Sequence, residues 1–119
     1  MVQGTIRGLG DLYEDSVERM EIHISKVFDD QLPNRNSHRV PIRLLIEQNA
    51  YEGGIRSTER NDYIWICPDL KTHNGQRTNL GHVLPVLGFK NKDKVNLSVS
   101  GTEIRVSHSL EKEESPPIG

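Results

Sequence analysis

Hydrophobic and polar residues alternate along several short segments of this chain, as they do in half-buried β-strands. Segment 20–25 alternates a methionine and two isoleucines with polar residues, and segment 40–46 has apolar residues at every second position. A turn at Gln48-Asn49 would return the chain as a further strand over 51–56. Within that strand, Gly53-Gly54 predicts a bulge or bend rather than flat pairing. Segment 63–67, Tyr-Ile-Trp-Ile-Cys, has the composition of a buried strand.

The second half of the chain predicts a short helix followed by a hairpin. Segment 71–79 is polar and contains a turn signal at Asn74-Gly75. Helical spacing then relates Leu80, Val83, Leu84 and Leu87. Thr78 or Asn79 can cap this helix, Gly88 can end it, and Pro85 inside it predicts a short or distorted helix. Apolar residues alternate on both sides of Ser100-Gly101, which is the clearest hairpin pattern in the chain.

These patterns predict a mainly β fold, a small open β-barrel (pseudobarrel) of about six or seven strands with one or two short helices. Near the N-terminus we expect at most one helical turn, over 15–20, before the first strand. From His108 onward the chain is rich in Glu, Lys, Ser and Pro. We therefore expect one domain over 1–108 and a disordered tail or linker over 109–119.

Composition narrows the classes of function. The chain has 119 residues, 34% of them hydrophobic, with a net charge of -2, one cysteine and no apolar run of membrane-spanning length. No signal peptide is visible, and a lone cysteine fits a reducing compartment, so we expect a cytoplasmic protein away from membranes. A pI near 6.2 argues against coating nucleic acid by bulk positive charge.

No pattern indicates a catalytic or metal centre. Cys67, His73 and His82 lack the paired spacing of zinc ligands, and no serine lies in a strained Gly-x-Ser-x-Gly turn. Asp62, Asp69 and Lys71 form a loose grouping around the aromatic strand, which leaves a small metal-dependent nuclease as one alternative. We expect no cofactor and no catalysis within this chain.

Two polar loops stand out instead, over 30–39 and 56–62, on successive connections between predicted strands. Both are rich in Arg, Asn, Ser and Thr, the side chains that contact base edges and phosphates. The simpler interpretation is that Asn, Ser and Asp form turns and Arg keeps loops soluble. Two such loops in succession favour a recognition surface, although Asp29, Asp30, Glu59 and Asp62 dilute their positive charge.

The order of these segments resembles the B3-type DNA-binding pseudobarrel. The resemblance rests on a strand leading into the Asn/Arg/Ser/His loop, the Ile-Arg-Leu-Leu-Ile strand over 42–46, the Arg-Ser-Thr loop and the aromatic strand. Its most specific part is the helix ending in Gly88-Phe89, a Lys-Asp turn and the Val-Asn-Leu-Ser-Val strand over 95–99. Among B3-type domains, the chain looks closest to the recognition or effector domains of type II restriction endonucleases.

The resemblance implies two arms that grip the DNA major groove, the N-arm over 34–39 and the C-arm over 56–63. The residues expected to contact double-stranded DNA are Arg35, Asn36, Ser37, His38, Arg39, Arg56, Ser57, Thr58, Arg60, Asn61 and Tyr63, with Lys71, Arg77, Lys90 and Lys92 on phosphates. The catalytic part would be a nuclease domain or subunit elsewhere. The other alternative is an adaptor barrel whose loops bind another polypeptide.

Overall fold

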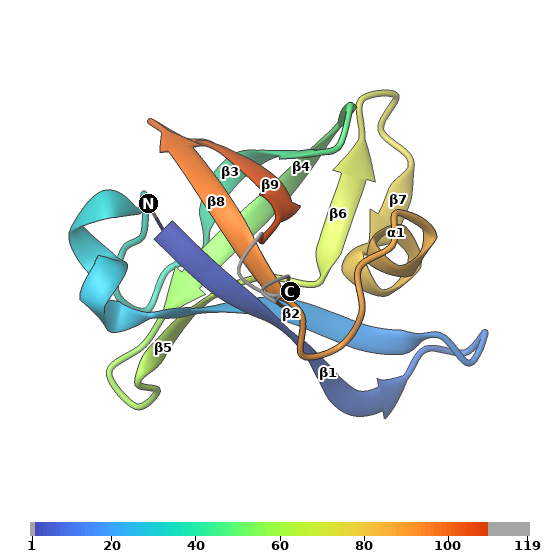
Figure 1. Ribbon diagram of the computed structural model, residues 1–119, viewed down its shortest axis with the longest axis horizontal. Coiled ribbons are helices and arrows are strands. Elements are labelled where there is room, and N and C mark those ends of the chain that lie inside the picture. Colours follow the sequence, from blue (N-terminus) through green and yellow to red (C-terminus); the bar gives the residue numbers. More distant parts are fainter. Residues whose placement is uncertain (1, 110–119) are drawn as a thin grey trace, which may run out of the picture.

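The computed structural model describes residues 2–109, which form nine strands, one 3₁₀ helix and one α-helix (Figure 1). In chain order the elements are β1 (Val2–Leu12), β2 (Glu18–Ser25), η1 (Lys26–Gln31), β3 (Val40–Ile46), β4 (Asn49–Ser57), β5 (Tyr63–Ile66), β6 (Asp69–Thr72), β7 (Arg77–Asn79), α1 (Leu80–Val86), β8 (Lys94–Ser100) and β9 (Glu103–His108).

Seven of the strands close into a barrel. They are hydrogen-bonded in the order β3-β9-β8-β1-β2-β5-β4, and an additional β3–β4 pairing joins the two ends. All neighbours are antiparallel except β3 and β9, which run parallel from Arg43–Glu103 to Ile46–Val106. Strands β6 and β7 extend the sheet from β4 outside the barrel. The prediction of a mainly β fold, a small barrel of about six or seven strands with one or two short helices, is confirmed, and the barrel is closed rather than open.

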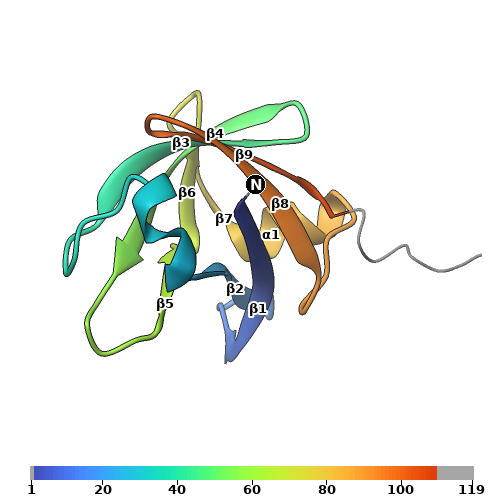
Figure 2. The ribbon, with the colours of Figure 1, turned by 60° about the vertical axis from the view of Figure 1, so that its left-hand side comes forward.

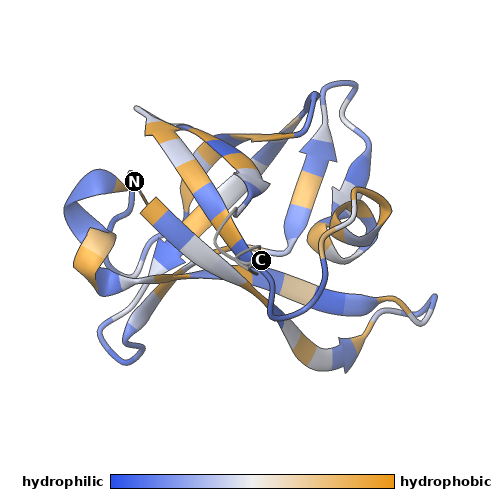
Figure 3. Ribbon diagram, viewed as in Figure 1, coloured by the Kyte–Doolittle hydropathy of each residue, from blue (hydrophilic) through white to orange (hydrophobic). Residues whose placement is uncertain are grey.

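Apolar and polar residues alternate along β8 and β9, as the bands of colour in Figure 3 show, and the apolar residues Val95, Leu97, Ile104 and Val106 are buried in the barrel. Each strand turns its apolar positions inward because successive side chains point to opposite faces. Phe89, Ile22, Leu44 and Leu84 are fully buried. Helix α1 packs against the start of β2, where Gly81 is required because a Cβ there would collide with the Glu18 carbonyl.

The predicted helix and hairpin are confirmed with small shifts. Asn79 caps α1 by accepting a hydrogen bond from the His82 amide at 3.0 Å, and Pro85 lies inside its last turn. The β8–β9 turn is Gly101-Thr102, one residue later than expected, because Ser100 and Glu103 pair. The β3–β4 turn is Glu47-Gln48, one residue earlier than expected, because Ile46 pairs with Asn49.

The helical turn expected over 15–20 does not form, since these residues make a turn and the start of β2. The pattern did not predict the strand over residues 2–12. In the polar stretch 71–79 the turn at Asn74-Gly75 is confirmed, and it joins two further strands, β6 and β7. Of the bulge or bend expected at Gly53-Gly54, the bulge is absent, since the β3–β4 register runs through both glycines without a shift. Instead, β4 changes its other partner there, from β6 to β5.

The predicted tail lies almost wholly outside the described residues, which end at Ser109. Ser109 itself, assigned to the tail, is 3% exposed. In the described part of the chain, no helix combines the length and hydropathy needed to cross a membrane.

Candidate nucleic-acid interface

The two arms lie side by side at one end of the barrel, on the left in Figure 2. The N-arm connects η1 to β3, and the C-arm connects β4 to β5. The Ser37 amide donates to the Ser57 carbonyl at 2.8 Å, and the Ser57 hydroxyl donates to Asn34 Oδ1 at 2.8 Å. Asn36 and Ser57 also form an isolated parallel bridge. The arms therefore move as one unit rather than as two independent loops.

The N-arm is held in a tight turn. The His38 amide donates to the Arg35 carbonyl at 3.0 Å, and Ser37 has a φ of 67°. At the base of the turn, the Asn34 side-chain amide donates to Asp29 Oδ1 at 3.0 Å. This arrangement exposes Arg35, Asn36, Ser37, His38 and Arg39, and it keeps Asn34 as the link to the other arm.

The C-arm is shorter than predicted, because Arg56 and Ser57 end β4 and Tyr63 begins β5. The Lys26 ammonium, from the start of η1, donates to the Thr58 carbonyl at 2.6 Å. Of the residues between the strands, Glu59, Arg60 and Asp62 are exposed, whereas Thr58 and Asn61 are half-buried. The exposed tip therefore has one cation and two carboxylates.

On the strands next to the arms lies a patch of aromatic and cationic side chains, which we call the floor: His23, Arg56, Tyr63 and Trp65. Register places Trp65 opposite His23 on one side and opposite Arg56 on the other. The His23 ring stacks on Tyr63 with centroids 4.1 Å apart, and its Nε2 lies 2.8 Å from Glu21 Oε1. All four floor residues are half-buried, on the outer face of β2, β5 and β4.

Arg39 lies across the backbone of β4 beside the floor. A Cβ at Gly54 would overlap with the Arg39 side chain, so the guanidinium rests where only glycine leaves room. Burial raises the pKa of the Cys67 thiol, although nearby Arg39 and Arg56 oppose the shift. A thiol kept protonated by burial is a poor nucleophile, so Cys67 serves packing here.

Eleven of the predicted contact residues are thus brought together by the two arms and the strand ends that carry them. One of them, Ser57, was expected to contact DNA, but it is 4% exposed and its hydroxyl is bonded to Asn34. It joins the arms rather than facing a ligand.

The four predicted phosphate contacts do not lie in the arms. Lys71 and Arg77 are on the β6–β7 hairpin, where they line a separate bowl that reaches the N-arm only at Arg39. Lys90 and Lys92 lie in the α1–β8 loop, which bonds to Ile6 in β1. This loop contacts β1 at Ile6, which pairs with Ile22 of β2. The arms lie farther along the same pair of strands, beyond the pairing of Gly4 with Ile24.

Sequence reasoning missed Lys26, His23 and Trp65. The aromatic strand looked buried on both faces, whereas only Ile64 and Ile66 face the core. The alternation of isoleucines with Tyr63 and Trp65 was the signal, since a period of two assigns the aromatics to the opposite face. His23 alternates with buried isoleucines in the same way.

The alternative nuclease grouping is spread out. Asp62 precedes β5, whereas Asp69 begins β6 after β5 has ended, so a whole strand separates the two carboxylates. Among residues 2–109, no group of three or more His, Cys, Asp or Glu side chains is placed to hold a metal ion.

Comparison with known proteins finds no family model, no curated protein and no solved structure that matches this chain.

Proposed function

We propose that this protein is a sequence-specific double-stranded DNA-binding module that reads the major groove with its N-arm and C-arm. The observation that carries the proposal is the junction of two Arg- and Asn-rich loops, distant in sequence, through Ser57 and Asn34. A groove about 12 Å wide admits such a protruding pair of segments. The B3-type resemblance in the sequence supports the same function and adds that a nuclease domain or subunit elsewhere would perform the cleavage.

Within this proposal, the exposure of each residue determines which part of the DNA it could contact. Arg35, Asn36 and His38 at the N-arm tip and Arg60 at the C-arm tip are exposed, so they are the candidates for base edges. Arg can bond guanine at two positions and Asn can do the same with adenine. Arg56 and Trp65, half-buried in the floor, are placed for contacts with the sugar–phosphate backbone or a thymine methyl.

The mixed charge of the arms favours recognition of base sequence over non-specific attraction to the DNA phosphates. Asp29, Asp30, Glu59 and Asp62 lie in or beside the arms and offset much of the charge of the arginines. Affinity should therefore depend on a few well-placed contacts, and the logarithm of the binding constant should fall only shallowly with the logarithm of salt concentration, because few counterions are released.

The test is selection of duplexes from a randomised pool, followed by NMR mapping of the amides that shift on binding. We expect one short sequence to be enriched, with shifts in 34–39 and 56–63. Arg35→Ala should weaken binding by about 1–3 kcal/mol and relax the preference at one base position, whereas Arg56→Ala should weaken binding about equally for all sequences. Arg105→Ala, which removes an exposed cation of β9, is the matched control and should change neither. Equal affinity for every duplex would remove sequence readout from the proposal.

The second candidate is an adaptor barrel that binds another polypeptide. The observation that favours it is the mixed charge of the C-arm tip, where Glu59 and Asp62 flank Arg60. Failure of the protein to bind any duplex at low salt, together with a complex with a polypeptide that Arg60→Ala weakens, would favour the adaptor.

A further inference from the structure

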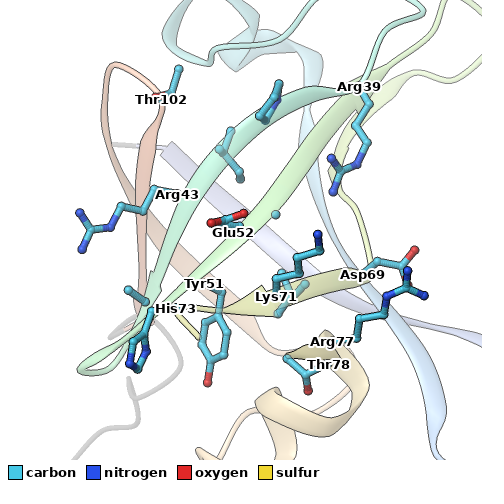
Figure 4. A pocket seen from close by; sticks show the side chains of 15 residues that line it. Arg39, Arg43, Tyr51, Glu52, Asp69, Lys71, His73, Arg77, Thr78 and Thr102 are labelled. Carbon is cyan, nitrogen blue, oxygen red and sulfur yellow. The ribbon is translucent and has the colours of Figure 1, made fainter. Parts of the chain in front are cut away.

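A second concave site lies beside the arms, on the outer side of β3, β4, β6 and β7. It is a bowl of about 810 Å³ that runs from Arg39, the last residue of the N-arm, to His73 in the β6–β7 turn (Figure 4). The bowl exists because β4 leaves β6 to pair with β5, which splays the β6–β7 hairpin away from the barrel. Pro41, Ala50 and Gly53 contribute apolar surface to it.

A row of charged residues crosses the sheet through this bowl. Strand register pairs Glu103 with Arg43, Arg43 with Glu52, and Glu52 with Lys71. Up to this point the charges alternate in sign, and the Arg43 guanidinium lies 4.0 Å from the Glu103 carboxylate. Opposite charges on directly paired residues stabilise a sheet.

The alternation breaks at the edge of the sheet. Lys71 is paired with Arg77 on β7, so two cations face each other directly, an arrangement that destabilises a sheet. Both side chains are exposed, and neither makes an ion pair with a carboxylate of residues 2–109. Among residues 2–109, β7 is the edge strand of the sheet, so no neighbouring strand in this part of the chain supplies a negative charge there.

The bowl is locally positive in a chain of net charge -2. Its lining contains the cations Arg39, Arg43, Lys71 and Arg77 but only two carboxylates, Glu52 and Asp69. In Figure 4, Glu52 and Lys71 lie near the middle of the labelled side chains, with Arg43 on one side and Arg77 on the other. A concave site with an excess of one charge concentrates ions of the opposite charge.

We propose that the bowl binds a phosphate-bearing ligand of about mononucleotide size, with Lys71 and Arg77 on the phosphate. The planar guanidinium of Arg77 can bond two phosphate oxygens, and Lys71 adds a point charge. The volume lies in the usual range for small-molecule sites, about 300–1,000 Å³. The apolar residues and the Tyr51 ring, which also lines the bowl, offer a surface for the non-phosphate part.

The phosphate can come from two sources, a free nucleotide or a DNA strand that extends from the arms past Arg39. The proposal does not depend on the DNA-binding function, because Lys71 and Arg77 belong to a hairpin outside the barrel and outside both arms.

The test is NMR titration of the full chain with adenosine monophosphate and, separately, with inorganic phosphate. We expect saturable shifts of the amides in 39–53 and 69–78, with adenosine monophosphate the tighter ligand. Lys71→Gln and Arg77→Gln should each weaken its binding by about tenfold or more, since each loses a charge-assisted hydrogen bond. Both residues are exposed, so the variants should keep the wild-type spectrum elsewhere.

Lys94→Gln is the matched control, because Lys94 is an exposed strand cation on β8 outside the bowl. Absence of saturation at about 10 mM ligand, or an equal loss in Lys94→Gln, would overturn the proposal. Duplex binding separates the two sources. Competition between adenosine monophosphate and duplex, with weaker duplex binding by Arg77→Gln, identifies a DNA phosphate as the ligand. Independent binding of the two identifies a free nucleotide.

Discussion

The hydroxyl of Ser57 donates a hydrogen bond to the side-chain oxygen of Asn34 at 2.8 Å, across 23 positions of sequence. Asn34 in turn donates to Asp29 in η1, so a chain of hydrogen bonds runs from the helix through the N-arm to the end of β4. Ser57 is buried, and water therefore competes little for this bond. Together with the backbone bond from the Ser37 amide to the Ser57 carbonyl, these two side chains fix the relative position of the two arms.

Ser57→Ala should loosen the junction between the arms without unfolding the barrel, since the backbone bond from the Ser37 amide to the Ser57 carbonyl remains. Loss of one buried hydrogen bond, with Asn34 Oδ1 left unpaired, should lower the free energy of unfolding by about 1–2 kcal/mol. Duplex affinity should fall as well, because the arms must then be ordered on binding. Urea unfolding and a binding titration measure the two effects. Ser98→Ala, an exposed serine of β8, is the control. Unchanged duplex affinity in Ser57→Ala would show that the junction is only structural.

Two adjacent glycines offer a matched pair. Gly54→Ala places a Cβ against the Arg39 side chain, which can swing into solvent, so we expect a stability change within about 1 kcal/mol and a clear loss of duplex affinity. Gly53→Ala places a Cβ 3.0 Å from Leu70 Cδ2 in the core, and crowding there should cost about 1–3 kcal/mol of stability. Thermal unfolding and duplex titration of both variants distinguish the effects. If Gly54→Ala binds duplex as wild type does, the position of Arg39 is not needed for recognition.

The chain has one tryptophan, Trp65, and it lies in the floor between His23 and Arg56. A duplex held by the arms should change its surroundings, so we expect its fluorescence to be quenched or shifted as duplex is added. The change should saturate with the same dissociation constant as binding measured by anisotropy of labelled DNA. Unaltered emission on a saturated complex would place the duplex away from the floor.

The Cys67 thiol should make stability fall at alkaline pH. Its pKa is raised above the ordinary value of 9.0 in the folded chain, mainly by burial. Below 9.0 both states keep the proton and stability is complete. As pH rises above that value, the unfolded chain loses the proton first, and the free energy of unfolding falls until the folded thiol ionises as well.

Cys67→Ala removes this contribution. Between about pH 7 and pH 10 its urea midpoint should fall less than that of the wild type. Tyr13 and Tyr51 also have raised pKa values, and because both proteins contain them, their effect cancels in the comparison. Equal slopes for the two proteins would mean that Cys67 ionises freely in the folded state.

Strands with large apolar residues on the inward face could be predicted from the sequence. Strands with small residues on that face could not. β3 alternates Ile42, Leu44 and Ile46 and was predicted within one residue of its ends. β1 turns Val2, Gly4 and Ile6 inward, and Gly4 is needed because a Cβ would lie 3.0 Å from Ile22. Glycine at an inward position interrupts the alternation of hydrophobic and polar residues. The close packing of β1 against β2, which requires Gly4, is therefore the reason that the sequence pattern did not predict β1.

The parts of the site that lie within a single segment of the sequence could be predicted, and the parts that depend on contacts between distant segments could not. The arms were found because Arg and Asn cluster within each loop, whereas the Ser57–Asn34 junction and the floor depend on which strands are neighbours. The charge row of the bowl likewise requires the registers of four successive strand pairs. Pairing between distant strands follows from closure of the whole barrel, and no window of the sequence contains it.

Barrel closure also sets the order in which the chain can fold. On one side of the barrel, β1 and β3 are joined through the β8–β9 hairpin, which pairs with β1 along one edge and with β3 along the other. Until that hairpin docks, β1 and β3 each keep an unpaired edge, and such edges readily pair with other chains. During synthesis these edges precede the hairpin that covers them, so the last strands to emerge complete the barrel. A hairpin supplied by a second copy would cover them equally well, which makes exchange of β8–β9 between molecules the expected route of misassembly.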